Sequence, residues 1–132
     1  MKIYTDGGSR GNPGKAASSF VIYDNEDEIY SQSKYLGIKS NNYAEYYAVL
    51  MALQYIANST QHTEVFFYSD SELIVRQLNG IYKIKNIELQ KLAIEIKQLI
   101  SEKKLNIEFN HIKRSGNKRA DELVNIELDK HL

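Results

Sequence analysis

Four acidic residues each lie in a short segment that indicates more than ordinary surface charge. Asp6 lies in YTDGGSRGNPG, Glu45 in SNNYAEYYA, Asp70 in FYSDSELIVRQLNG and Asp121 in NKRADEL. A carboxylate at the end of an apolar strand or on an apolar helix loses hydration, so its ionised form needs a cation nearby. If the four groups converge, they would form a site for divalent metal ions. Metal-assisted hydrolysis of a phosphodiester is the first chemistry that such a site suggests.

The elements that must position these acids follow from hydrophobic periodicity and turn residues. Strands are predicted over residues 1–6, 16–24, 28–36, 64–69 and 106–112, and helices over 42–58, 71–78, 87–103 and 117–130. The glycines from Gly7 to Gly14 predict a turn between the first two strands. The resulting order, βββαβααβα, favours an α/β fold with a mixed sheet, in which an antiparallel meander is followed by parallel strands with helical connections.

Asp6 and Asp70 are each expected at the end of a strand. If these two strands are parallel neighbours, both carboxylates project into one crevice beyond the carboxyl edge of the sheet, where α/β proteins bind ligands. An acid at a strand end is also a common turn residue or helix cap. For Asp70, which precedes Ser-Glu-Leu, capping and metal ligation are equally good interpretations.

Glu45 is predicted on a helix, 42–58, that is apolar nearly all round and therefore buried between other elements. Together with Ala44, Ala48 and Ala52 it belongs to a stretch whose small side chains would let the helix lie close to the sheet. A glutamate in such surroundings needs a partner, which is either a buried arginine or lysine or a shared metal ion.

Asp121 is predicted in the first turn of the last helix, with Asn117 or Ser115 as the cap. Acids are common there because they complement the helix dipole, so a structural role is the simpler interpretation of Asp121 taken alone. A basic loop directly before it favours a functional role. That loop carries Lys113, Arg114, Lys118 and Arg119 and no acid.

Composition bounds the kind of protein. The 132 residues predict one domain, 1–132, and the 17 basic and 17 acidic side chains give a net charge of zero, without the excess of lysine and arginine typical of general nucleic-acid binders. Cysteine is absent, which excludes disulfides and thiolate metal sites within the chain. With no signal-peptide pattern and no long apolar span, the expectation is a cytoplasmic monomer that makes no use of membranes.

Taken together, the segments resemble the type 1 ribonuclease H family. The motifs Asp-Gly-Gly-Ser-x-Gly-Asn-Pro-Gly, Asn-Asn-x-Ala-Glu, Ser-Asp-Ser and Asn-x-x-Ala-Asp-x-Leu occur in the family's order and cover nearly the whole chain. The resemblance implies a five-stranded mixed sheet flanked by helices and endonucleolytic hydrolysis of the RNA strand of RNA–DNA hybrids. It also implies that Asp6, Glu45, Asp70 and Asp121 are the catalytic carboxylates and hold two Mg²⁺ ions, with Mn²⁺ as the alternative. Asp6 is expected to bridge the ions, because its glycine neighbours would let the phosphate backbone approach.

The resemblance further implies substrate contacts. Asn12, Asn41 and Asn42 correspond to residues that read the minor groove of the hybrid, and Ser40 to a contact with a phosphate of the DNA strand. The same residues also suit turns and helix caps, and both roles can hold together.

Many family members carry a mobile histidine near the last carboxylate. His111 lies ten residues before Asp121, but its place at a strand end favours a structural role, with an auxiliary catalytic role as the alternative. Arg114 is the candidate for a mobile cation that handles the phosphate. The chain resembles a minimal form of the family, without a hybrid-binding domain or a basic protrusion, since only residues 81–86 stand where the protrusion would be.

Two other functions compete with a hybrid-specific ribonuclease. One is a nucleic-acid-binding module that kept the fold and lost turnover, which the presence of all four acids disfavours. The other is a related DNA nuclease or polynucleotidyl transferase of the same architecture, since fold alone does not determine function. The Asn41-Asn42 pair before Glu45 disfavours the second alternative.

Overall fold

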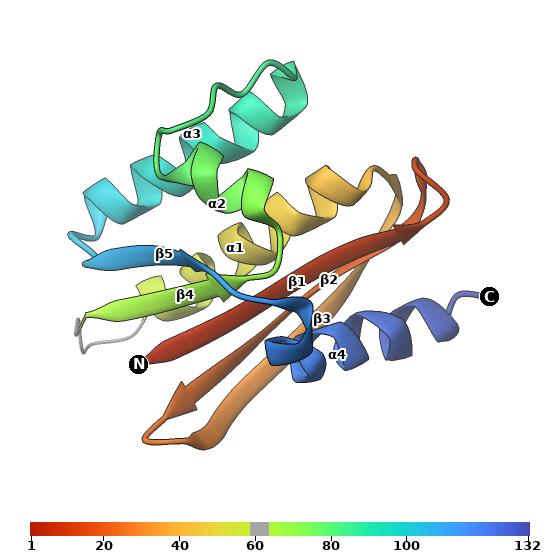
Figure 1. Ribbon diagram of the computed structural model, residues 1–132, viewed down its shortest axis with the longest axis horizontal. Helices are drawn as coiled ribbons and strands as arrows, with labels where there is room; N and C mark the ends of the chain where they lie inside the picture. The colour runs from red at the N-terminus through yellow and green to blue at the C-terminus, as the bar shows by residue number, and fades with distance from the viewer. Residues whose placement is uncertain (59–63) are drawn as a thin grey trace.

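Three strands that form an antiparallel meander open the chain: β1 (Lys2–Arg10), β2 (Gly14–Asp24) and β3 (Asp27–Lys39) (Figure 1). They are followed by α1 (Asn41–Ala57), β4 (Val65–Ser69), α2 (Glu72–Leu78), α3 (Ile87–Glu102), β5 (Ile107–His111), a 3-10 turn (Arg114–Gly116) and α4 (Lys118–Asp129). The computed structural model describes residues 1–58 and 64–132. The predicted order of strands and helices is confirmed.

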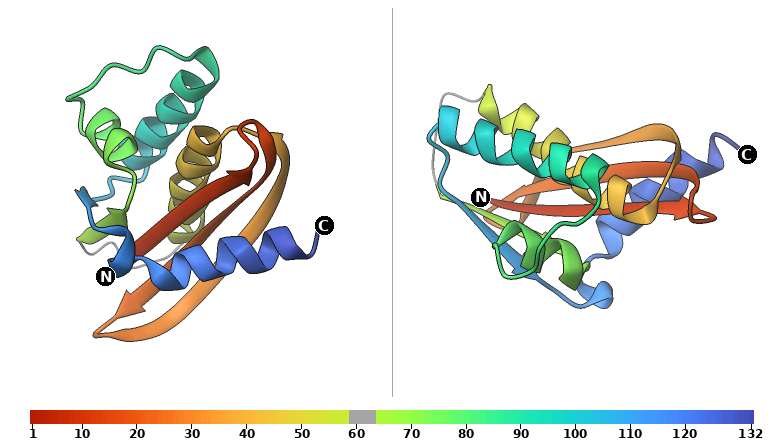
Figure 2. Two further views of the ribbon diagram at one scale, coloured as in Figure 1. Left: turned by 45° about the vertical axis from the view of Figure 1, so that its right-hand side comes forward. Right: turned by 90° about the horizontal axis from the view of Figure 1, so that it is seen from above.

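The five strands form one mixed sheet in the order β3-β2-β1-β4-β5. β1 pairs with β2 in the antiparallel sense and with β4 in the parallel sense, and β4 is parallel to β5. The helices α1, α2 and α3 cover one face of the sheet and α4 lies across the other (Figure 2). The larger core lies between the sheet, α1 and α3, whereas Ala17, Val124 and Leu128 form a smaller cluster under α4. None of the described helices is long and apolar enough to cross a membrane.

The turn predicted to begin at Gly7 is wrong, because β1 continues to Arg10. Gly7 pairs with Ser18 and Arg10 with Lys15, so the chain reverses only after Arg10. Glycine weakens a strand but does not prevent pairing, so β1 can continue through Gly7 and Gly8 because β2 stays paired with it. Asp6 therefore lies within a strand and not at its end.

Asp6 nevertheless faces a crevice, because its parallel neighbour β4 is shorter. Thr5 pairs with Ser69, the last residue of β4. Asp6 is thus the first residue of β1 beyond the end of β4, level with Asp70. The predicted meeting of these two acids at one edge of the parallel pair is confirmed for this geometric reason.

α1 packs unusually close to β1, as the alanine stretch predicts. Ala44, Ala48 and Ala52 are fully buried, and the Ser18 hydroxyl donates a 2.6 Å hydrogen bond to the carbonyl of Ala44. A Cβ placed on Gly7 would collide with the backbone of Ala44 and would lie 2.5 Å from the Glu45 nitrogen. Gly7 is therefore required for the approach of α1, which carries Glu45.

Candidate active site

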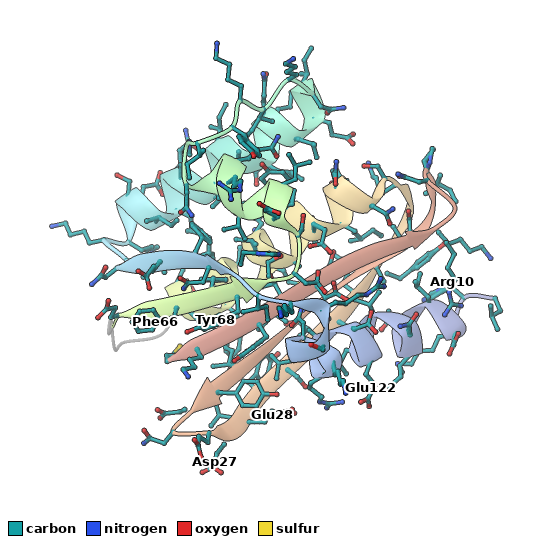
Figure 3. The ribbon with its side chains drawn as sticks, viewed as in Figure 1. Arg10, Asp27, Glu28, Phe66, Tyr68 and Glu122 are labelled. Carbon is teal, nitrogen blue, oxygen red and sulfur yellow. The ribbon has the colours of Figure 1, made fainter. Side chains whose placement is uncertain are left out.

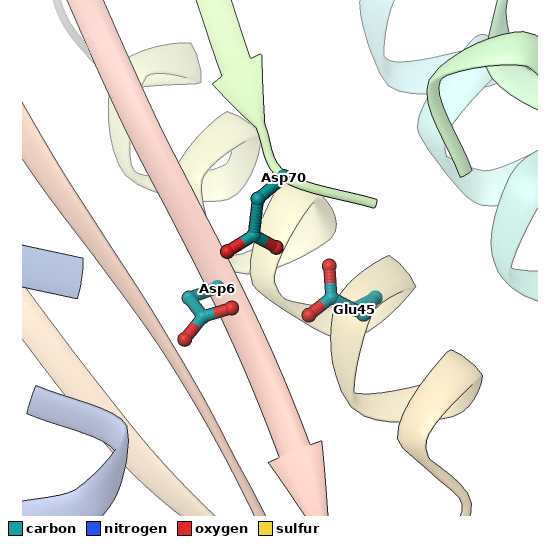
Figure 4. A group of neighbouring side chains, drawn as sticks. All are labelled: Asp6, Glu45 and Asp70. Atoms are coloured by element: carbon teal, nitrogen blue, oxygen red, sulfur yellow. The ribbon is translucent and has the colours of Figure 1, made fainter. Parts of the chain in front are cut away.

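Three carboxylates meet where β4 ends. Asp6 from β1, Glu45 from α1 and Asp70 from the segment after β4 point toward one another (Figure 4), and each offers an oxygen within 4.8 Å of the others. Asp6 and Glu45 are buried, with relative exposures of 6% and 8%. No lysine, arginine or histidine of the described residues forms an ion pair with any of the three. The buried cation that could have partnered Glu45 is therefore not found.

Glu45 is held by groups that the short strand β4 leaves available. Gly7 has no residue opposite it on β4, and its N–H donates a 2.9 Å hydrogen bond to Glu45 Oε1. The hydroxyl of Ser69 lies 3.4 Å from Glu45 Oε2. The Glu45 carboxylate thus accepts the hydrogen bond that a residue of β4 would otherwise accept from Gly7. It approaches Asp6 from the face of the sheet that α1 covers.

Asp70 does not cap the helix that follows it. Ser71 is the N-cap of α2, and its hydroxyl accepts a 3.3 Å hydrogen bond from the Ile74 N–H. The Ser71 N–H in turn donates to the hydroxyl of Ser69. Because neighbouring side chains satisfy the local backbone, the Asp70 carboxylate is available to the cluster. Of the two interpretations of Asp70, ligation is the one that the geometry favours.

Burial and mutual repulsion disfavour the ionised forms of the cluster. Burial, followed by the charge of Asp70, raises the pKa of Asp6 from 3.8 to about 7. Burial, followed by the charges of Asp6 and Asp70, also raises the pKa of Glu45 well above its usual range. The hydrogen bond from Gly7 opposes both shifts but does not offset them. Without a cation, the pair therefore retains a proton near neutral pH, and a bound divalent ion would displace it.

Asp121 is the fourth acid of the cleft. It lies in the first turn of α4 and lines the same cleft as Asp6, Glu45 and Asp70, and its charge contributes to the raised pKa of Asp6. It is outside the group of three whose oxygens approach within 4.8 Å. The structure thus brings all four predicted acids to one cleft, and three of them into direct proximity.

The donor set fits a hard divalent cation. All ligand atoms in the cluster are carboxylate oxygens, which Mg²⁺, Mn²⁺ and Ca²⁺ prefer over softer metals. Asp6 and Glu45 are buried, have raised pKa values and find no cationic partner within residues 1–58 and 64–132, so a metal ion would stabilise their ionised forms. The cluster of Asp6, Glu45 and Asp70 can therefore hold a divalent ion.

Asn117 is expected from the sequence as a helix cap, but its side chain binds β1 instead. It is the N-cap residue of α4 by position, but its side chain makes no capping hydrogen bond. The buried amide nitrogen of Asn117 instead donates a 2.8 Å hydrogen bond to the carbonyl of Thr5. This bond ties the start of α4 to β1 next to Asp6, and it sets the position of Asp121 relative to the cluster. In the sequence, the only signal for this role of Asn117 is its position four residues before Asp121.

Replacing Asn117 by alanine is expected to lower the free energy of unfolding by about 1 to 3 kcal/mol, because the Thr5 carbonyl loses a buried donor. Activity should fall by more than this loss of folded protein explains, since α4 and Asp121 lose their tie to β1. Urea unfolding and activity measured on the same preparation test this. As a control, Asn110, which is half-buried on β5, should tolerate alanine with little change in activity. Equal losses in both variants would contradict a specific role for Asn117.

The predicted substrate residues form a network at the start of α1. The Asn41 N–H donates to the Asn12 side-chain oxygen at 3.1 Å, and Asn41 Oδ1 accepts from the backbone N–H and hydroxyl of Ser9 at 2.7 and 3.0 Å. Ser40 is the N-cap of α1 and accepts from the Tyr43 N–H. These are the turn and cap roles expected as alternatives. Asn41 and Asn42 also line the cleft, and contacts of all four residues with substrate stay predictions.

His111 and Arg114 differ in their position relative to the carboxylates. His111 is the last residue of β5, is exposed, and is not among the residues that line the cleft. Its expected place at a strand end is confirmed. Arg114 opens the 3-10 turn before α4 and does line the cleft. Of the two, only Arg114 stands where a cation could reach a bound phosphate.

The ribonuclease H-like class of nucleases is defined by a mixed five-stranded sheet with helices on both faces. Acids meet where its central parallel strands end, as Asp6 and Asp70 do here. A family described as reverse transcriptase-like matches residues 4–126. The structure is similar to that of LC11-RNase H1, isolated from compost and solved in complex with an RNA/DNA hybrid, with a TM-score of 0.92 and 43% identity over 98% of this chain and 97% of that one. The chain belongs to the type 1 ribonuclease H family.

Two curated relatives are longer than this chain. Ribonuclease HI of Halobacterium salinarum is 32% identical over 98% of the chain and 64% of its own length. A bifunctional protein of Mycobacterium tuberculosis is 35% identical over 96% of the chain and 35% of its own length. The chain thus spans between about a third and two thirds of the length of these two relatives.

Proposed function

We propose that this protein is a metal-dependent endoribonuclease that hydrolyses the RNA strand of RNA–DNA hybrids. The observation that carries the proposal is the cluster of Asp6, Glu45 and Asp70, which has no cationic partner among the described residues and lies in a ribonuclease H fold. The similar LC11-RNase H1, 43% identical, was solved with an RNA/DNA hybrid, which supports this class of substrate.

Asp6, Glu45, Asp70 and Asp121 would hold two Mg²⁺ ions, with Mn²⁺ as the alternative. When bound, such ions bind the scissile phosphate, lower the pKa of a water and stabilise the charge of the leaving oxygen. The chain's own residues position the ligands. Gly7 donates to Glu45, and Asn117 ties the helix of Asp121 to β1.

The remaining residues would bind and orient the hybrid. Asn12, Asn41 and Asn42 would contact its minor groove and Ser40 a DNA phosphate, at the start of α1. Arg114, on the rim of the cleft, would contact a phosphate of the strand that is cut. We further propose that the chain acts as a single domain, as a monomer, in the cytoplasm.

The direct test is incubation with an end-labelled RNA–DNA hybrid in Mg²⁺, alongside the Asp70→Asn variant and an EDTA control. Internal cleavage of the RNA that vanishes in both controls is the expected result. Duplex RNA and duplex DNA in parallel distinguish a hybrid-specific ribonuclease from a DNA nuclease. A hybrid that stays intact with both Mg²⁺ and Mn²⁺ but is retained by the protein would overturn the proposal in favour of a binding module.

The affinity for Mg²⁺ should depend steeply on pH. Because the pKa of Asp6 is raised to about 7, a metal ion must displace a proton below that pH but not above it. The apparent Kd for Mg²⁺ should therefore increase about tenfold for each pH unit below neutrality and level off near about pH 8. Calorimetric titration in the absence of substrate measures this. An affinity independent of pH between about 5 and 8 would show that the cluster carries no such proton.

A further inference from the structure

Arg10 is a cation of the cleft that the metal chemistry leaves without a role. It ends β1, and Figure 3 shows it beside the C-terminal half of α4. It lines the same cleft as Asp6, Glu45, Asp70 and Asp121. Resting on the proposed function, we propose that Arg10 binds a phosphate of the nucleic-acid strand that occupies the carboxylate site, and so extends the substrate contact along α4.

The two cations of the cleft lie at opposite ends of α4. Among the described residues that line it, only Arg10 and Arg114 are positively charged. Arg114 precedes the first turn of α4, whereas Arg10 contacts Asn125 and Asp129 in its last two turns. Asp121 lies between them. A phosphodiester backbone that follows α4 over the carboxylates would therefore meet one cation on each side of the reacting phosphate.

The guanidinium of Arg10 has unused donors. Its Nη2 lies 2.7 Å from Asp129 Oδ1 and 3.5 Å from both the carbonyl and the side-chain oxygen of Asn125. All three contacts belong to Nη2, and neither Nε nor Nη1 makes a hydrogen bond within residues 1–58 and 64–132. Arginine presents its donors in a planar fork that matches phosphate oxygens, so one edge of this fork remains available for a ligand.

The ion pair with Asp129 does not account for Arg10 by itself. The two side chains are 40% and 61% exposed, and exposed pairs contribute little to stability. Asp129 contacts the guanidinium only through Nη2 and so leaves its other donors free. A cation here also matters more than in a basic protein, since the chain has no net positive charge and four acids line the cleft.

The test compares Arg10→Gln with Asp129→Asn, which break the same ion pair from opposite sides. KM for an RNA–DNA hybrid is measured at fixed Mg²⁺ between about 50 and 300 mM salt. Arg10→Gln should raise KM about threefold to tenfold at the lowest salt and reduce the slope of log KM against log salt by about 0.7 to 0.9, the value of one phosphate contact. Asp129→Asn should not raise KM and should keep the wild-type slope.

Equal behaviour of the two variants, with the wild-type salt slope in both, would show that Arg10 only anchors α4 and would overturn the inference. Arg10→Lys, which keeps the charge, should restore the slope, so that a folding defect in Arg10→Gln cannot be mistaken for a lost contact. Failure of the proposed function gives a different result, because the wild-type protein would then leave the hybrid intact at every salt concentration.

Discussion

Asp6→Asn is expected to abolish cleavage of an RNA–DNA hybrid while making the metal-free protein more stable at alkaline pH. Asp6 offers an oxygen within 4.8 Å of both Glu45 and Asp70, and an amide cannot supply the negative charge that a divalent ion needs. We expect kcat to fall by at least about 1000-fold, because the metal ions that stabilise the transition state lose a shared ligand. Single-turnover cleavage with saturating enzyme measures the loss.

The gain in stability follows from the direction of the pKa shift. The pKa of Asp6 is raised from 3.8 to about 7 in the folded protein, so the folded state holds a proton that the unfolded state releases. Folding stability of the wild type therefore falls as pH rises from about 4 to about 7, and stays low above that range. Asparagine does not titrate, so the variant escapes this penalty. Its advantage over the wild type should grow by about 2.5 kcal/mol between about pH 5 and pH 8.

Urea unfolding in EDTA at both pH values tests the effect, with Asp27→Asn as the matched control. Asp27 is an exposed acid in the β2–β3 hairpin (Figure 3). Its replacement by asparagine should change neither the activity nor the way in which stability depends on pH. Saturating Mg²⁺ should reverse the order of stability at about pH 8, because only the wild type gains binding energy from the ion. An Asp6→Asn protein less stable than the wild type in EDTA at alkaline pH would contradict the view that this carboxylate is a strained, buried charge.

Gly7→Ala is expected to remove both stability and activity. The new Cβ would collide with the backbone of Ala44 and lie 2.5 Å from the Glu45 nitrogen, a distance that no rotamer change can relieve because the colliding atoms are backbone. α1 would have to move away from β1, with a loss of about 3 kcal/mol or more in the free energy of unfolding. Glu45 would move with the helix and lose its hydrogen bond from Gly7.

The neighbouring glycine offers the control for this prediction. A Cβ on Gly8 would face the other side of the sheet and meet only Val124 Cγ1, at an ordinary contact distance of 3.8 Å. Gly8→Ala should therefore leave the free energy of unfolding within about 0.5 kcal/mol of the wild type. Thermal and urea unfolding of both variants decide the matter. If Gly7→Ala were as stable as Gly8→Ala, the close approach of α1 would not be what requires glycine at this position.

The packing of α1 against Gly7 changes the role that the sequence suggests for the Gly7-Gly8 pair. From sequence, the glycines beside Asp6 suggest room for the phosphate backbone of the substrate. In the structure α1 fills the space that a Cβ on Gly7 would need, whereas a Cβ on Gly8 would point toward Val124 of α4, although both glycines line the cleft. The motif is thus partly a packing feature, and the substitution at Gly7 should impair the site by displacing a ligand helix and not by blocking substrate.

Local patterns in the sequence determined the order of strands and helices, the buried character of α1 and the identity of the acids, because periodicity, turn residues and motif spacing are properties of neighbouring residues. They did not determine that β1 runs on through its glycines, nor whether Asp70 caps a helix, since both depend on which groups lie opposite in space. The place of Asn117 against Thr5 and of Arg10 against Asp129 depends likewise on contacts between residues more than one hundred positions apart. Tertiary structure alone decided these, because the unequal lengths of β1 and β4 and the packing of α1 and α4 on opposite faces create the cleft in which the acids meet.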